Sequence, residues 1–194
     1  MRLLLTSIYA NVAGELLKII NDKPENITVA FVATAADVYE DKSFVDVDRG
    51  KLKEQGFKVK EISLTDKNLS ELEKETADCK VLFVAGGNTF YLLQETRKSG
   101  FDTILEKSKS EIIYVGSSAG SVLIGPDIQF VDTLDDPKQA PELGNYTGLH
   151  LVDFVVLPHY GKQKYEEKYQ TIIQRASNLG IKTRTLKDDE FILV

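Results

Sequence analysis

The chain has 194 residues, a length that favours one globular domain over residues 1–194 and leaves little room for two. Hydrophobic residues make up 42% and charged residues 28%, which excludes a disordered or collagen-like protein, and the net charge of −6 argues against nucleic acid as a partner. The single cysteine excludes an intrachain disulfide framework, and without a signal peptide or a long apolar run we expect a cytoplasmic protein that does not bind membranes.

Short β-branched and leucine-rich runs alternate with longer segments of helical period along the chain. In chain order, the expected strands are Arg2–Thr6, Ile27–Thr34, Lys58–Leu64, Val81–Ala85, Ile112–Gly116, Leu151–Leu157 and Ile181–Thr185. The expected helices are Val12–Ile20, Ser43–Gln55, Ser70–Glu75, Thr89–Lys98, Phe101–Lys109 and Lys164–Leu179. This alternation is typical of βαβ units that form a mostly parallel sheet, so we expect an α/β fold.

The strand that ends at Gly116 runs directly into Gly-Ser-Ser-Ala-Gly and then into the start of a helix. This arrangement is typical of a nucleophile elbow, in which small residues two before and two after the serine permit a tight turn. Gly116 and Gly120 hold those places around Ser118, and the Ala119 amide is expected at the helix N-terminus, where it can stabilise an oxyanion. A glycine-rich turn with a serine as N-cap is an equally good reading of the pentapeptide alone.

A serine nucleophile needs a base, and the sequence contains only two histidines. His159 follows the strand Leu151–Leu157, where strand ends gather around the crevice of a doubly wound sheet. His150 begins the same strand, so the length of that strand is expected to place it at the opposite edge of the sheet. We therefore expect His159 to act on Ser118, and His150 to be structural or exposed.

The orienting carboxylate is expected from the long stretch around Val131–Gly148, which has no clear period and is rich in Asp, Pro, Gly and Asn. The available carboxylates are Asp127, Asp132, Asp135, Asp136 and Glu142. The chain order Ser, Asp, His is one of the known triad orders. A carboxylate-rich loop is more often solvated surface, so the residues alone do not select one member.

A second turn, Ala85–Thr89, places two glycines between a strand and a helix. Glycines let the backbone approach a substrate closely, so this turn can supply the second amide donor of an oxyanion hole. A phosphate-binding turn is the weaker interpretation, because the lysine of a P-loop and the third glycine of a dinucleotide fingerprint are missing.

Three segments together resemble one protein family. They are Val-Ala-Gly-Gly-Asn-Thr-Phe at residues 84–90, Gly-Ser-Ser-Ala-Gly at residues 116–120 and Leu-Pro-His-Tyr at residues 157–160. In this order and at these separations they resemble peptidase family S51, the serine peptidases that include peptidase E (aspartyl dipeptidase) and cyanophycinase. The resemblance runs over nearly the whole chain. It implies a class I glutamine amidotransferase-like fold, a three-layer α/β/α sandwich with a mostly parallel sheet, in which a serine replaces the usual cysteine.

The resemblance also implies residue roles. Ser118 is the nucleophile, His159 is the general base, and the amides of Gly87 and Ala119 are the oxyanion donors. Asp135 is the implied acid because residues 133–137 resemble the Thr-x-Asp-x-Pro segment of the family, and Asp132 is the second choice because the spacing from the nucleophile is slightly longer here. The expected substrate is a small peptide, cleaved by a dipeptidase or exopeptidase without a metal or a cofactor. The sequence does not decide whether the protein forms a homodimer.

One segment departs from the family pattern. Peptidase E carries arginines after the histidine that are implicated in holding the aspartate of the substrate, whereas residues 161–168 here contain lysines and no arginine. Lys162 and Lys164 lack the bidentate fork of arginine and are expected at the surface, so strict aspartyl specificity does not follow.

Two alternatives stay open. A catalytically impaired pseudoenzyme or small-molecule binding domain of the same fold would explain the missing arginines and the undecided acid. An esterase of the α/β-hydrolase type shares the triad order, but the chain is short for that fold and only 41 residues separate Ser118 from His159.

Overall fold

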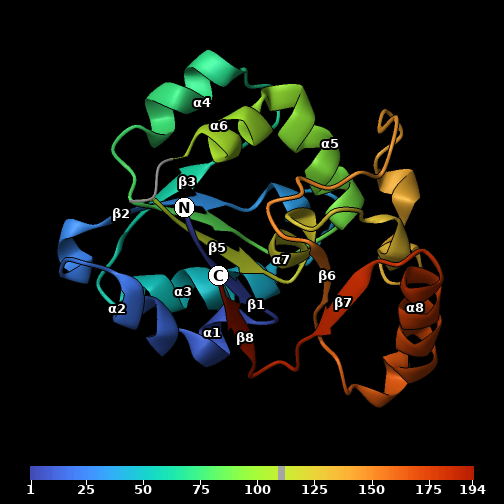
Figure 1. Ribbon diagram of the computed structural model, residues 1–194. Coiled ribbons are helices and arrows are strands. Elements are labelled where there is room, and N and C mark those ends of the chain that lie inside the picture. Colours follow the sequence, from blue (N-terminus) through green and yellow to red (C-terminus); the bar gives the residue numbers. More distant parts are fainter. Residues whose placement is uncertain (109–111) are drawn as a thin grey trace.

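The computed structural model describes residues 1–108 and 112–194 and contains a six-stranded main sheet (Figure 1). Its strand order is β3-β2-β4-β5-β1-β8. The strands are β1 (Arg2–Thr6), β2 (Thr28–Val32), β3 (Lys58–Ile62), β4 (Val81–Val84), β5 (Ile113–Ser117) and β8 (Phe191–Leu193). All neighbouring pairs are parallel except β1 and β8, which run antiparallel. The mostly parallel sheet is therefore confirmed.

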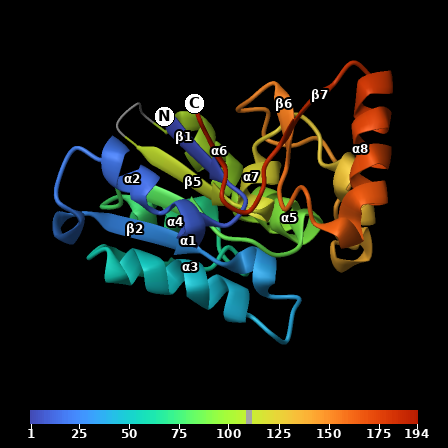
Figure 2. The same ribbon diagram turned by 90° about the horizontal axis from the view of Figure 1, so that it is seen from below.

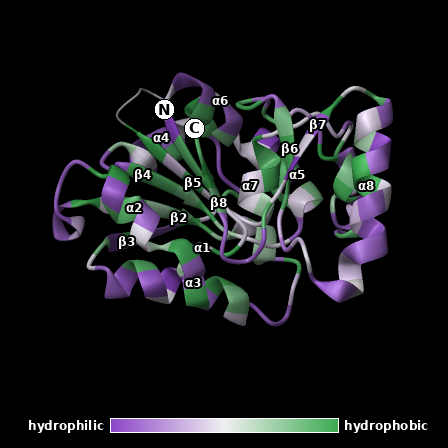
Figure 3. Cartoon of the chain, turned by 60° about the horizontal axis from the view of Figure 1, so that its bottom comes forward, coloured by the Kyte–Doolittle hydropathy of each residue, from purple (hydrophilic) through white to green (hydrophobic). Residues whose placement is uncertain are grey.

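Helices cover both faces of this sheet, because side chains along each central strand alternate between two buried cores. On β1, Leu4 packs in the core beneath α1 to α3, whereas Leu3 and Leu5 pack in the core beneath α4 to α7. The helices are α1 (Tyr9–Val12), α2 (Gly14–Ile19), α3 (Ser43–Glu54), α4 (Leu69–Thr76), α5 (Thr89–Ser99), α6 (Phe101–Lys107) and α7 (Ala119–Leu123). Figure 2 shows the layers from below, and Figure 3 shows the hydrophobic central strands between helices of mixed hydropathy. The three-layer α/β/α sandwich is confirmed.

The strand before the predicted base does not join the main sheet. β6 (Phe154–Leu157) pairs in parallel with β7 (Lys182–Thr185) in a separate two-stranded sheet, on which α8 (Glu166–Asn178) packs. This subdomain lies beside the carboxyl ends of the main strands (Figure 1). It therefore brings the residues that follow β6 and β7 to the end of the sheet where β5 meets α7.

Other differences from the predicted elements are local. The predicted helix Val12–Ile20 is two short helices that meet at Gly14, a weak helix former. The predicted helix Phe101–Lys109 ends at Lys107, and Lys109 lies outside the described residues. The remaining elements are short 3₁₀ helices at Pro24–Asn26, Thr34–Ala36, Gln129–Thr133, Pro137–Gln139 and Gln163–Tyr165. None of the described helices is long and apolar enough to cross a membrane.

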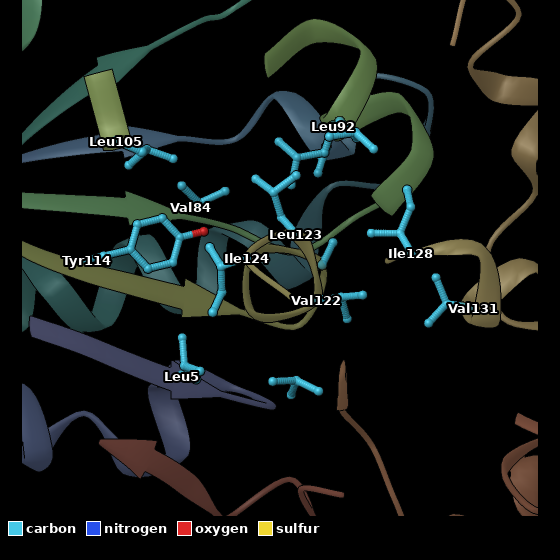
Figure 4. Close-up of a cluster of buried hydrophobic side chains, with 14 of the residues drawn as sticks. Leu5, Val84, Leu92, Leu105, Tyr114, Val122, Leu123, Ile124, Ile128 and Val131 are labelled. Atoms are coloured by element: carbon cyan, nitrogen blue, oxygen red, sulfur yellow. The ribbon is translucent and has the colours of Figure 1, made fainter. Parts of the chain in front are cut away.

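Packing against the core stabilises the short helix α7, which is too short to be stable on its own. Leu123 and Ile124 pack among side chains of β1, β4 and α5 (Figure 4). The buried Tyr114 hydroxyl donates a hydrogen bond of 2.6 Å to the carbonyl of Gly120, the second residue of α7. Because a helix of this length is marginal on its own, these contacts fix the turn between β5 and α7.

Candidate active site

The turn between β5 and α7 has the geometry of a nucleophile elbow. Ser118 adopts φ 50° and ψ −110°, a conformation that a residue with a side chain rarely occupies. A Cβ atom on Gly116 would lie 2.7 Å from the backbone of Gly120, and a Cβ atom on Gly120 would lie 2.1 Å from the carbonyl oxygen of Val84. The requirement for small residues on both sides of Ser118, predicted from the sequence, is thus a direct steric requirement of this turn.

This crowding predicts a large stability effect for Gly120→Ala. The new methyl group would overlap the backbone of β4, which cannot move without disturbing the sheet, so the free energy of unfolding should fall by roughly 3 kcal/mol. Gly50→Ala is the matched control: Gly50 lies inside α3 with open space around its Cα, and the change should add up to about 1 kcal/mol. Urea unfolding of both variants measures the difference, and equal stabilities would contradict the steric account.

The structure brings Ser118 and His159 together, although they come from different sheets. The Ser118 Oγ lies 2.9 Å from His159 Nε2. His159 follows β6 and has φ 62°, and its backbone N–H donates to the Ser7 hydroxyl oxygen at 2.8 Å. The pairing predicted from the sequence is therefore present, with the imidazole held through its backbone as well as its ring.

The other ring nitrogen of His159 faces a carboxylate that the sequence analysis did not select. His159 Nδ1 lies 2.6 Å from Asp188 Oδ1, and Asp188 stands between β7 and β8. The Ser7 hydroxyl donates to the same oxygen at 2.9 Å, and the Lys162 ammonium lies 2.7 Å from Asp188 Oδ2. These contacts complete a continuous chain of polar groups from Ser118 through His159 to Asp188.

The partners of Asp188 decide its charge. Partial burial raises the pKa of this carboxyl group, but hydrogen bonds from Lys162, His159 and Ser7 lower it by more, so the pKa lies below its ordinary value. Asp188 is therefore ionised at neutral pH. An ionised carboxylate on Nδ1 favours the tautomer in which Nε2 can accept a proton from Ser118.

The predicted acid, Asp135, contacts a different residue. Its Oδ2 accepts hydrogen bonds from the backbone N–H of Thr89 at 2.9 Å and from the Thr89 hydroxyl at 2.6 Å. The second choice, Asp132, forms an ion pair with Arg175 at 2.7 Å. The structure therefore corrects the predicted acid, because the carboxylate in contact with His159 belongs to Asp188.

The other groups considered from the sequence also lie elsewhere. Asp127 accepts from Gln129, Asp136 caps the N–H of Lys138, and Glu142 pairs with Lys98. His150 is exposed and does not line the pocket, as expected, although β6 begins at Phe154 rather than directly after His150.

The sequence does not identify Asp188, because the charged segment around it, Lys187–Glu190, is typical of a solvated turn. The signal that could have found it is the pairing of two parallel strands, which is not visible locally. β6 and β7 are in register, and the Leu186 N–H donates to the Leu157 carbonyl at 2.9 Å, so the residues that follow both strands lie at one end. The order Ser, His, Asp along the chain also differs from the assumed order.

The two predicted oxyanion donors line the same pocket as the nucleophile predicted from the sequence. Gly87 and Ala119 both line the pocket that contains Ser118, and within the described part of the chain neither amide donates a hydrogen bond to another group. Gly87 has φ 145°, and a Cβ atom there would lie 2.1 Å from the Ala35 carbonyl oxygen, so this position requires glycine. Both N–H groups are thus free to bind an oxygen of a ligand.

The pocket has a volume of about 510 Å³. Its walls combine polar groups at the elbow with apolar side chains, among them Phe44, Val47, Val131, Leu134 and Tyr165. The segment 131–148, expected to be functional, contributes three of the lining residues. Among the residues that the structure describes, no group of three or more His, Cys, Asp or Glu side chains is placed to hold a metal ion.

The family model for peptidase family S51 matches residues 3–194. The chain belongs to peptidase family S51. An uncharacterized peptidase of Listeria monocytogenes is 38% identical over 147 residues, which is 75% of this chain and 72% of that protein. Peptidase E of Citrobacter koseri is 38% identical over a shorter stretch of 85 residues, 43% of this chain and 35% of that protein.

Solved structures agree with this assignment. A crystal structure of a provisionally assigned peptidase E protein from Listeria monocytogenes EGD-e superposes with a TM-score of 0.90 and 32% identity, covering all of this chain and 93% of that one. A peptidase from an acI-B1 Actinobacterium shares the fold, with a TM-score of 0.70 and 16% identity. This S51 chain is therefore a peptidase, and the serine type is that of its family.

Proposed function

We propose that this S51 peptidase hydrolyses small peptides as an exopeptidase of the dipeptidase type, through Ser118, His159 and Asp188. The observation that carries the proposal is the polar chain from the Ser118 hydroxyl to His159 at 2.9 Å and on to Asp188 at 2.6 Å. Ser118 and His159 line one pocket together with Gly87 and Ala119, whose amides donate no hydrogen bond within the described part of the chain. Asp188 takes the place of Asp135 in the triad inferred from the sequence.

Each group has a defined role in the proposed reaction. The Ser118 oxygen attacks the scissile carbonyl carbon while His159 Nε2 accepts the hydroxyl proton, and the carbonyl oxygen becomes an oxyanion between the amides of Gly87 and Ala119. His159 then donates that proton to the leaving amine, and the C–N bond breaks to give an acyl-enzyme. A water molecule, deprotonated by His159, releases the acid and restores Ser118. Asp188 stabilises the imidazolium during both transfers.

The pocket favours a small substrate without an acidic anchor. Its volume of about 510 Å³ lies in the range of small-molecule sites. Lys162 is the one lysine or arginine among the lining residues that the structure describes, and Asp188 already pairs with it at 2.7 Å. We therefore propose a peptidase that does not depend on an aspartyl side chain in the substrate.

Reaction with a fluorophosphonate, followed by peptide mapping, tests the proposal. We expect covalent labelling at Ser118 that is absent in Ser118→Ala and strongly slowed in His159→Ala, because the hydroxyl needs the imidazole to lose its proton. A dipeptide panel with neutral, basic and acidic first residues then follows on the same preparations. Absence of labelling at Ser118 would instead favour a catalytically impaired binding domain of this fold.

A further inference from the structure

Two carboxyl groups and one lysine line the pocket among the described residues, and burial raises the pKa of both carboxyl groups. Asp48 and Asp135 both line it, and neither forms an ion pair within the described part of the chain. Lys162, the one lysine that lines the pocket in the described part of the chain, is paired with Asp188. With no unpaired lysine or arginine beside them among the described residues, these carboxyl groups would be stabilised in the ionised form by a positively charged group of the substrate.

Of these two carboxyl groups, only Asp135 has an oxygen that accepts no hydrogen bond from the described residues. Asp48 is almost fully buried, and its side chain accepts from the Ala10 N–H at 2.9 Å and from the Ser117 hydroxyl. Asp135 receives both bonds from Thr89 on Oδ2, and Oδ1 has no hydrogen-bond partner among the described residues. The two hydrogen bonds from Thr89 hold this carboxylate in place and leave Oδ1 open to a ligand.

Thr89 and Gly87 lie on the same turn, so the position of Asp135 can be compared with that of the scissile bond. Thr89 holds Asp135, and two residues earlier on the same turn Gly87 presents the unpaired amide of the proposed oxyanion hole. In an amino-acid residue, the carbonyl oxygen and the α-nitrogen are separated by only two carbon atoms. A substrate whose first carbonyl oxygen lies at Gly87 therefore places its terminal nitrogen within reach of a carboxylate held at Thr89.

We propose that Asp135 binds the protonated α-amino group of the first residue of the substrate, so that the enzyme cleaves after that residue. The assignment rests on the proposed function, because it positions the scissile carbonyl at Ser118. It makes Asp135 a specificity-determining residue for peptides with a free N-terminus. N-acylated peptides, which lack this charge, are poor substrates for the same reason.

Two esters that differ only in the amino group test the assignment: alanine p-nitrophenyl ester and p-nitrophenyl propionate, each corrected for spontaneous hydrolysis. We expect the wild-type protein to prefer the alanine ester by about 100- to 1,000-fold in kcat/KM, since a desolvated charge pair is lost with the propionate. Asp135→Asn should remove most of this preference, because kcat/KM for the alanine ester should fall far more than kcat/KM for the propionate. Thr89→Val, which removes the 2.6 Å hydroxyl contact, should weaken the preference in part.

The outcomes separate the alternatives. Asp136→Asn is the matched control, because Asp136 is exposed and an asparagine can still cap the N–H of Lys138, so both ester rates should stay at the wild-type level. An equal fall of both rates in Asp135→Asn would show a role in the triad or in folding and would overturn the assignment. Equal wild-type rates on both esters would overturn it as well. Failure of the proposed function looks different, because neither ester would then acylate Ser118.

Discussion

Asp188→Asn should lower kcat on a cleaved dipeptide by about 10⁴-fold with little change in stability. An asparagine keeps the shape of the side chain and its contact with Ser7, but an amide at His159 Nδ1 no longer favours the tautomer with a free Nε2. It also no longer stabilises the imidazolium that forms when Ser118 attacks. Steady-state kinetics with substrate in excess measures the loss, and urea unfolding verifies that the fold is kept.

Two variants sharpen this prediction. Asp189→Asn changes the neighbouring, exposed carboxylate and should leave kcat near the wild-type value. Asp132→Asn removes an ion pair with Arg175 on the outside of the subdomain and should also leave kcat unchanged. If Asp188→Asn kept kcat within about tenfold of wild type, Asp188 would not be the acid of a working triad.

The parts of the site that the sequence predicted are those defined by local sterics. The central strands could be recognised because both faces are buried, which demands apolar residues at every position from Val81 to Val84. The elbow could be recognised because no side chain fits at Gly116 or Gly120. Gly87 could be recognised because its φ of 145° and the nearby Ala35 carbonyl admit only glycine.

The parts that the sequence did not predict depend on pairing between distant segments. The run from Leu151 to Leu157 predicts a strand equally well in the main sheet or in a second one, since apolar character does not identify the partner. The carboxylate that contacts His159 depends on that choice, because Asp188 meets His159 only when β7 pairs with β6. The resemblance to a family segment predicts Asp135 as the acid, but the structure places Asp135 in the pocket, in contact with Thr89 and not with His159.

The strained turn explains why the nucleophile and its base should behave as one unit. Ser118 and His159 have φ of 50° and 62°, and their side chains meet at 2.9 Å. The Ser7 hydroxyl accepts from the His159 N–H and donates to Asp188. Either side chain without the other has no partner for proton transfer. The energetic contributions of Ser118 and His159 are thus expected to be strongly coupled.

Ser118→Ala should therefore lower kcat by about 10⁶-fold, His159→Ala by a similar factor, and the double variant by no more than either single change. The residual rate over the uncatalysed reaction should be about 10³- to 10⁴-fold, because the amides of Gly87 and Ala119 still bind the oxyanion. Active-site titration must first exclude contaminating wild-type enzyme, which would mask so large an effect.

The adjacent serine provides the matched control for this prediction. Ser117 is buried and its hydroxyl oxygen accepts a hydrogen bond from the Tyr9 N–H, so Ser117→Ala should reduce stability by about 1 kcal/mol and change kcat by less than about tenfold. Losses that multiply in the Ser118→Ala, His159→Ala double variant would mean that the two residues act independently. In that case His159 would not be the base that activates Ser118, whatever their separation in the folded protein.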